Sequence, residues 1–269
     1  MSSFFVQLPT VVICTFLAGM TLFCIEVGFR VGRRFGIDEE RASGALVVVQ
    51  NSVMGLMAFL LGLSFSFTAG RFERRHDLEQ REANCLGTAY LRTALVEAPA
   101  GKQIRALLPR YVKARLDTYR VRLIDQEAYL AAKARSNELQ DRIWKLDTEL
   151  FRLDKLDRRT DLLTQVLNDV FDAGGDVEEA RRHRVPEIIF FLLFTSVWVC
   201  GLFVGYDFGR SGRRVVPAWL LFSGLTAMTI YITLDLDRPE RGFIRNSHAP
   251  LLLLHESMMA GDQPPDQPK

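Results

Sequence analysis

Cysteine and histidine are scarce in this chain, which holds four of each among 269 residues. The cysteines form no CxxC pair and no cluster with histidine, so the sequence supports neither a disulfide framework nor a zinc site. HExxH, GxSxG and Walker-type loops are also missing, so we expect no metal, no cofactor and no enzyme activity. The residues concerned are Cys14, Cys24, Cys85, Cys200, His76, His183, His248 and His255.

A strong charge of either sign is also absent, because 34 basic residues nearly balance 32 acidic ones. The formal net charge of +2 is too small to indicate a nucleic-acid partner, and no DNA- or RNA-binding motif is present. The first apolar stretch has its basic residues after it instead of before it, which argues against a signal peptide. No alternating strand pattern occurs, so the chain is expected to be helical throughout.

Hydrophobic residues make up 48% of the chain and are concentrated in four blocks, with the charges lying between them. Each block meets or approaches the roughly 20 residues that a helix needs to cross the hydrocarbon core. We therefore predict an all-α membrane protein with four transmembrane helices in two pairs flanking a soluble helical domain. The expected ranges are 8–70 for transmembrane helices 1 and 2, 71–184 for the soluble domain, 187–235 for helices 3 and 4, 236–260 for a C-terminal tail packing on the soluble domain and 261–269 for a disordered end.

The second block, at about 44–70, carries polar and small residues among its apolar ones. Asn51, Gly55, Phe59, Gly62 and Ser66 follow one another at intervals of three or four, so they share one helix face. Small residues on such a face allow close packing against another helix. The same face can line a narrow aqueous path with an aromatic gate. The residues alone leave both interpretations open.

Charged side chains mark the ends of the blocks. Glu26 precedes Arg30 by one helical turn near the end of the first block, which is the spacing of an ion pair. Arg71, Arg74 and Arg75 follow the second block. They would anchor the helix end to lipid phosphates or, repeated as rings in an oligomer, raise the anion concentration at a pore mouth.

The fourth block ends in Asp235 and Asp237, at the helix terminus where negative charge is unfavourable. Basic residues at the same level of the membrane would compensate. We therefore predict that Asp235, Asp237 and Arg238 form a structural ion-pair collar that joins the tail to the middle domain. The candidate partners are Arg71, Arg74 and Arg75, or Arg181, Arg182 and Arg184.

The charged stretch between the second and third blocks is predicted to be helix, broken once at 99–101 and again at 174–175 by proline and glycine. Asn84, Thr88 and Arg92 share one face, where hydrogen bonds between neighbouring helices are favoured over a part in ion passage. A leucine-rich stripe at helical spacing predicts packing against another helix. The stripe consists of Leu139, Ile143, Leu146, Leu150 and Leu153.

Three stretches together resemble the bestrophin-like family of bacterial membrane proteins. They are Gly62-Leu-Ser-Phe-Ser-Phe continuing into Arg71-Phe-Glu-Arg-Arg75, Glu82-Ala-Asn-Cys-Leu-Gly-Thr-Ala-Tyr-Leu-Arg92, and Leu234-Asp-Leu-Asp-Arg-Pro-Glu-Arg-Gly242 with Pro250 following. The resemblance implies a remote relation to the bestrophin anion channels, which are homopentamers with four spanning helices per subunit. In those channels the second helix lines a central pore that has a hydrophobic, often aromatic, constriction.

The resemblance implies an oligomeric ion channel that is anion-selective, conducts ions such as chloride, and forms a homo-oligomer of five subunits in membrane lipid. It also implies a multi-pass protein of the inner cell membrane with the soluble domain in the cytoplasm. Arginine counts near the spans do not decide this orientation, with seven in the two short loops and ten beside the middle and tail. No acidic cluster after the fourth span resembles the calcium clasp of the animal channels, so calcium gating is not implied. The alternative is a non-conducting scaffold or sensor whose helical domain binds a cytoplasmic partner, which the stripe at 139–153 favours.

Overall fold

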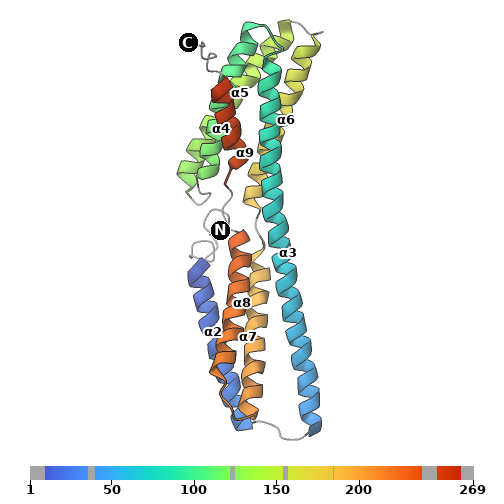
Figure 1. Ribbon diagram of the computed structural model, residues 1–269, viewed down its shortest axis with the longest axis vertical. Helices are drawn as coiled ribbons and strands as arrows, with labels where there is room; N and C mark the ends of the chain where they lie inside the picture. The colour runs from blue at the N-terminus through green and yellow to red at the C-terminus, as the bar shows by residue number, and fades with distance from the viewer. Residues whose placement is uncertain are drawn as a thin grey trace, which may run out of the picture. The chain divides into compact units, whose positions relative to one another are not determined.

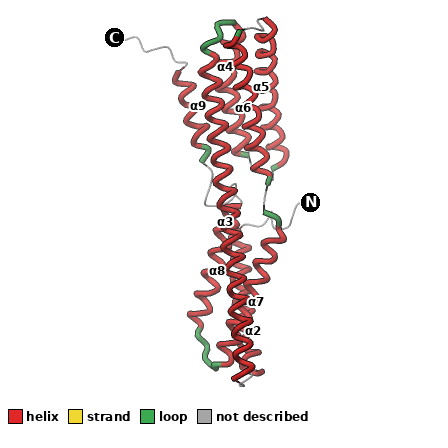
Figure 2. Tube along the Cα trace, turned by 90° about the vertical axis from the view of Figure 1, so that its right-hand side faces the viewer, coloured by secondary structure: helices red, strands yellow, loops and turns green. Residues whose placement is uncertain are grey.

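The computed structural model of the protein describes residues 10–35, 40–121, 125–153, 157–183, 185–237 and 247–261. These residues contain α-helices and no strand, which confirms the predicted all-α class (Figures 1 and 2). The helices are α2 (Thr10–Phe35), α3 (Glu40–Thr93), α4 (Pro99–Arg120), α5 (Gln126–Leu153), α6 (Arg158–Arg182), α7 (Glu187–Arg210), α8 (Val216–Asp237) and α9 (Ala249–Gly261).

Among the residues that the structure describes, four helices are long and apolar enough to cross a membrane, as the sequence predicted. They are α2, α3 from Leu46 onward, α7 from Ile188 and α8. The helix α3 runs for 54 residues without a break, far beyond the roughly 20 that a bilayer requires. Its first part is therefore a spanning segment, and its second part belongs to a charged helical region.

The chain forms two compact units, each assembled from segments far apart in the sequence. The membrane unit comprises Met1–Phe72 and Arg184–Arg245, and the polar unit comprises Glu73–His183 and Asn246–Lys269. Within the membrane unit, α2, α7 and α8 lie together with the first part of α3 beside them (Figure 1). Of the predicted disordered end at 261–269, Gly261 is the last residue of α9, while residues 262–269 lie outside the described residues, as does Arg238.

Glycines set the closest helix contact of the membrane unit, which joins α2 to α7. A Cβ atom added to Gly28 would lie 2.1 Å from the carbonyl oxygen of Leu202, and one added to Gly205 would lie 1.9 Å from that of Ile25. No side chain fits at these distances, so the backbones approach because glycine leaves the space open. The same tight contact occurs at Gly32 and Gly209.

The predicted Glu26–Arg30 pair forms, with 2.8 Å between Arg30 Nε and Glu26 Oε1. Arg214, from the loop between α7 and α8, adds a second ion pair to the same oxygen at 2.9 Å. Its guanidinium also lies 4.7 Å from the ring centroid of Phe29. Both arginine side chains are more than half exposed, so each pair stabilises the fold by no more than about 1 kcal/mol.

The polar unit has one core that α3, α4, α5, α6 and α9 share. The predicted stripe on α5 packs into it, with Ile143 and Leu150 buried, whereas Leu153 is 78% exposed. The short helix α9 adds Leu251 and Met258. The predicted break at 174–175 was wrong, because α6 continues through both glycines.

Candidate functional site

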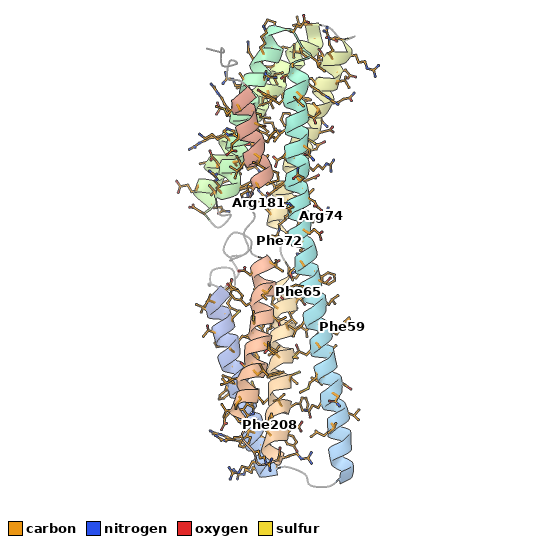
Figure 3. The ribbon with its side chains drawn as sticks, in the orientation of Figure 1. Phe59, Phe65, Phe72, Arg74, Arg181 and Phe208 are labelled. Carbon is orange, nitrogen blue, oxygen red and sulfur yellow. The ribbon has the colours of Figure 1, made fainter. Side chains whose placement is uncertain are left out.

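The spanning part of α3 buries little of its surface against its own chain. Only 11% of its most apolar window is buried, compared with 39% for α2 and for α7 and 28% for α8. Large apolar side chains stand exposed along it, among them Val48, Leu56, Phe59 and Phe67. Figure 3 labels Phe59 and Phe65, of which 64% and 41% are exposed. A surface of this kind has to be covered by lipid or by another protein surface.

The five residues of the predicted small and polar face all lie on this uncovered surface. Asn51, Gly55, Phe59, Gly62 and Ser66 are each exposed within one chain. A Cβ atom added to Gly55 or Gly62 would meet no atom of the described residues within 4 Å. Packing of this face against a described helix of the same chain therefore does not occur. Its role as a pore lining stays a prediction.

The other face of α3 holds the helix to its neighbour α7. Gln50 Nε2 donates to Asp207 Oδ2 at 2.6 Å, while Gln50 Oε1 is buried without a hydrogen-bond partner among the described residues. Met57 packs into the apolar core that α2, α7 and α8 share with this helix. Asp207 was not singled out from the sequence, although it is the one carboxylate between Ile188 and Arg210. The pair lies near the ends of the two apolar spans, where it fixes the first part of α3 to α7.

The three arginines that follow the spanning part of α3 differ in their surroundings. Arg75 is buried, and it donates from Nε to the Ala180 carbonyl at 3.2 Å and from Nη2 to the His183 carbonyl at 3.1 Å. It thus satisfies carbonyl groups at the C-terminal end of α6. Arg71 is partly buried and Arg74 is exposed, and Arg74 is labelled in Figure 3. Attraction of anions stays a prediction, and Arg74 is the member best exposed to perform it.

The aspartates at the end of α8 are buried, with exposures of 1% for Asp235 and 4% for Asp237. Asp237 Oδ1 accepts a hydrogen bond from the backbone N–H of Val185 at 3.2 Å, just before α7 begins. A helix N-terminus is the favourable end for negative charge, so α7 compensates part of the charge that arginines were expected to balance. The collar stays a prediction, since Arg238 lies outside the described residues.

A family model described as Bestrophin-like domain matches residues 15–251. The chain belongs to the Bestrophin-like family. No curated protein matches its sequence. Among solved structures it is similar to a bacterial bestrophin homologue from Klebsiella pneumoniae, whose structure solved by zinc phasing gives a TM-score of 0.66 at 14% identity over 93% of this chain and 98% of that one. Two single-residue variants of that homologue each give 0.69 at 14% identity, and these matches cover 91% and 94% of this chain and 97% and 99% of the variants.

The polar unit of this bestrophin-like chain contains a buried charged network that the sequence pattern did not reveal. Arg115 Nε donates to Glu82 Oε1 at 2.7 Å, and its Nη2 donates to the Gly174 carbonyl at 2.7 Å and to the Tyr119 hydroxyl. The Tyr119 hydroxyl donates to Glu82 Oε2. Burial, together with the Glu82 charge, holds the pKa of Tyr119 well above its usual value.

Gly174 makes room for this network. A Cβ atom at that position would lie 3.0 Å from Arg115 Nη2 and 3.3 Å from Glu82 Oε1. The space needed by Arg115 and Glu82 therefore explains why position 174, in the interior of α6, is a glycine. Arg92, on the predicted polar face, donates from Nη1 to the Leu162 carbonyl of α6 at 2.6 Å, which is the interhelical bond expected there. Within the part of the chain that the structure describes, no group of His, Cys, Asp and Glu is arranged to hold a metal ion.

Proposed function

We propose that the protein is an oligomeric ion channel, selective for anions such as chloride, in which α3 of every subunit lines a central pore. The observation that carries the proposal is the uncovered face of α3 with Asn51, Gly55, Phe59, Gly62 and Ser66. A helix fixed on one side through Gln50 and open on the other can turn its open face toward a shared axis. Membership of the Bestrophin-like family supports the same arrangement.

The order of residues along this face suits a gated path. Asn51 and Ser66 would offer polar groups at two levels, and glycines would leave the path open at two others. Phe59 lies between them, where a ring of aromatic side chains would form an apolar constriction that closes by dewetting. At the exit, rings of the exposed Arg74, with Arg71 beside it, would raise the local anion concentration.

Five subunits in the inner cell membrane, with the polar unit in the cytoplasm, is the assembly that the family resemblance favours. A closed ring gives every subunit the same surroundings and leaves no exposed end. It would cover the apolar side chains of α3 that a single chain exposes, including Leu56 and Phe67.

The test is the mass of the purified protein in mild detergent, followed by anion flux from liposomes. A ring of about five copies together with chloride efflux is the expected result. A monomer or dimer would exclude a pore shared between many α3 helices. A ring that passes no anion under any gating condition would exclude conduction while leaving the assembly intact.

The rival hypothesis of a scaffold or sensor depended on the α5 stripe as a docking surface. Leu139, Ile143, Leu146 and Leu150 are instead packed in the core of the polar unit. The stripe is therefore occupied by the chain's own helices, and no specific observation now favours that hypothesis over the channel.

A further inference from the structure

An open cavity of about 360 Å³ lies within the membrane unit between α2, α3 and α7. This volume falls in the range of roughly 300–1,000 Å³ found for small-molecule sites. Its lining is apolar apart from a tyrosine. Lining residues include Gly28 and Val31 of α2, Leu46 of α3, and Leu202, Phe203 and Tyr206 of α7.

The cavity lies beside the glycine contact between α2 and α7. Gly28 contributes backbone and no side chain to the lining, and it lies where the two helices touch, since a Cβ atom there would be 2.1 Å from the Leu202 carbonyl oxygen. The walls present few polar groups that could hold water, and an apolar cavity of this kind excludes it. In a bilayer, the abundant apolar molecule that can enter an open cavity is a lipid acyl chain.

Two arginines stand one helical turn beyond this lining. Arg34 follows Val31 by three residues, and Arg210 follows Tyr206 by four, so each continues the face of its helix that borders the cavity. One turn advances about 5.4 Å along the helix axis. Arg34 is exposed and Arg210 is partly buried.

Two acidic groups that the structure describes at this end of the membrane unit are engaged elsewhere. Glu26 pairs with Arg30 and Arg214, and Asp207 accepts the hydrogen bond from Gln50. Within the described ranges, Arg34 and Arg210 take part in no ion pair, and the Arg34 guanidinium lies over the ring of Phe35. Among the side chains that the structure describes, no carboxylate neutralises these two arginines, so their charge can meet an anion at the mouth of the cavity.

We propose that this cavity binds one acyl chain of an anionic phospholipid, whose phosphate and headgroup are held by Arg34 and Arg210. The apolar cavity suits the acyl chain of such a lipid, and the two arginines one turn away suit its negatively charged headgroup. A cavity that a second copy of the chain covers would need no such cations.

The test compares phosphatidylglycerol with phosphatidylcholine, added to the delipidated full-length protein in detergent and measured by native mass spectrometry. Phosphatidylglycerol is expected to bind roughly 30-fold more tightly, which corresponds to about 1 kcal/mol for each of the two arginines. The double variant Arg34→Gln/Arg210→Gln should lose this preference. Arg213→Gln is the matched control, because Arg213 is exposed in the neighbouring loop and does not continue the lining face; it should keep the preference.

A second variant tests the cavity itself. Val31→Trp would place a large side chain in the space, and it is expected to reduce binding of both lipids while the protein elutes with unchanged mass. Equal binding of the two lipids by the parent protein would overturn the proposal. Undiminished lipid binding by Val31→Trp would also overturn it. A change in the oligomeric mass of Val31→Trp with no change in bound lipid would overturn it as well, because that result would assign the cavity to a second copy of the chain.

Discussion

At the scale of single residues, Asp147 on α5 is a carboxyl group in an unfavourable place. Asp147 is 1% exposed, and its Oδ1 has no hydrogen-bond partner among the described residues. Burial raises the pKa of Asp147 to about 6, although a hydrogen bond with Thr164 opposes the change. In the unfolded chain the pKa of aspartate is about 3.9. Folding therefore favours the protonated form.

The direction of the pH effect follows from these two values. The contribution of Asp147 to stability is complete below about pH 4 and is lost as the pH rises through about 6. Asp147→Asn should therefore raise the stability at pH 7.5 by about 1–3 kcal/mol and change it much less at pH 4. Denaturant unfolding of the detergent-solubilised protein at both pH values measures this. A variant that is less stable than the parent at pH 7.5 would show that the ionised carboxylate is stabilising.

Glu82 presents the opposite case, a buried charge that is fully partnered. Glu82→Gln would leave Arg115 without its counter-charge in the core, and removal of one partner from a buried pair costs about 3–5 kcal/mol. The expected result is a large fall in melting temperature. Arg81→Gln is the control, because the Arg81–Asp176 pair spans 3.8 Å between largely exposed side chains and contributes at most about 1 kcal/mol. Similar losses from the two substitutions would count against the network as a centre of stability.

At the scale of helices, two sets of glycines perform different tasks. Gly205→Ala should break the α2–α7 contact, because the new methyl group would meet the Ile25 backbone, and little folded protein should be recovered. The methyl group of Gly62→Ala would meet no atom of the described residues within 4 Å, and alanine stabilises a helix by about 1 kcal/mol relative to glycine. The melting temperature of this variant should equal or exceed that of the parent. The yield and melting temperature of both variants check this, and equal damage at both positions would contradict it.

The helices show which features of the fold are local in the sequence. Four spans were predictable because apolar length belongs to each segment alone. The continuity of α6 could not be predicted from its own residues. Gly174 leaves room for the side chain of Arg115, which belongs to α4. The spacing of Gly28 and Gly32 could have signalled close packing, but it does not name α7 as the partner.

Some features of the candidate site could likewise be predicted from the sequence, and others could not. Helical spacing was enough to place Asn51 and Ser66 on one face of α3. It could not indicate that this face meets no other helix among the described residues, or that Gln50 on the other face meets Asp207. The burial of Arg75 was also unpredictable, since the carbonyls that it satisfies are more than a hundred residues away.

At the scale of the whole molecule, the proposed pore makes Phe59 the residue to change. Phe59→Ala should widen the apolar constriction and increase anion flux from liposomes severalfold, because a less apolar neck is easier to wet. Phe23→Ala on α2 is the matched control, since Phe23 is 60% exposed on another span and should leave the flux unchanged. If both variants conduct like the parent, Phe59 does not form the constriction.

The uncovered surface of α3 also bears on how the protein is made. If the proposed ring forms, a chain whose second span has so little support from its own described helices would gain much of its folding free energy only when copies meet. In the proposed assembly, stability is then subject to mass action, and dilution weakens the fold together with the complex. Newly inserted subunits would be the most vulnerable form, and the amount of protein in the membrane would help determine how long each copy survives.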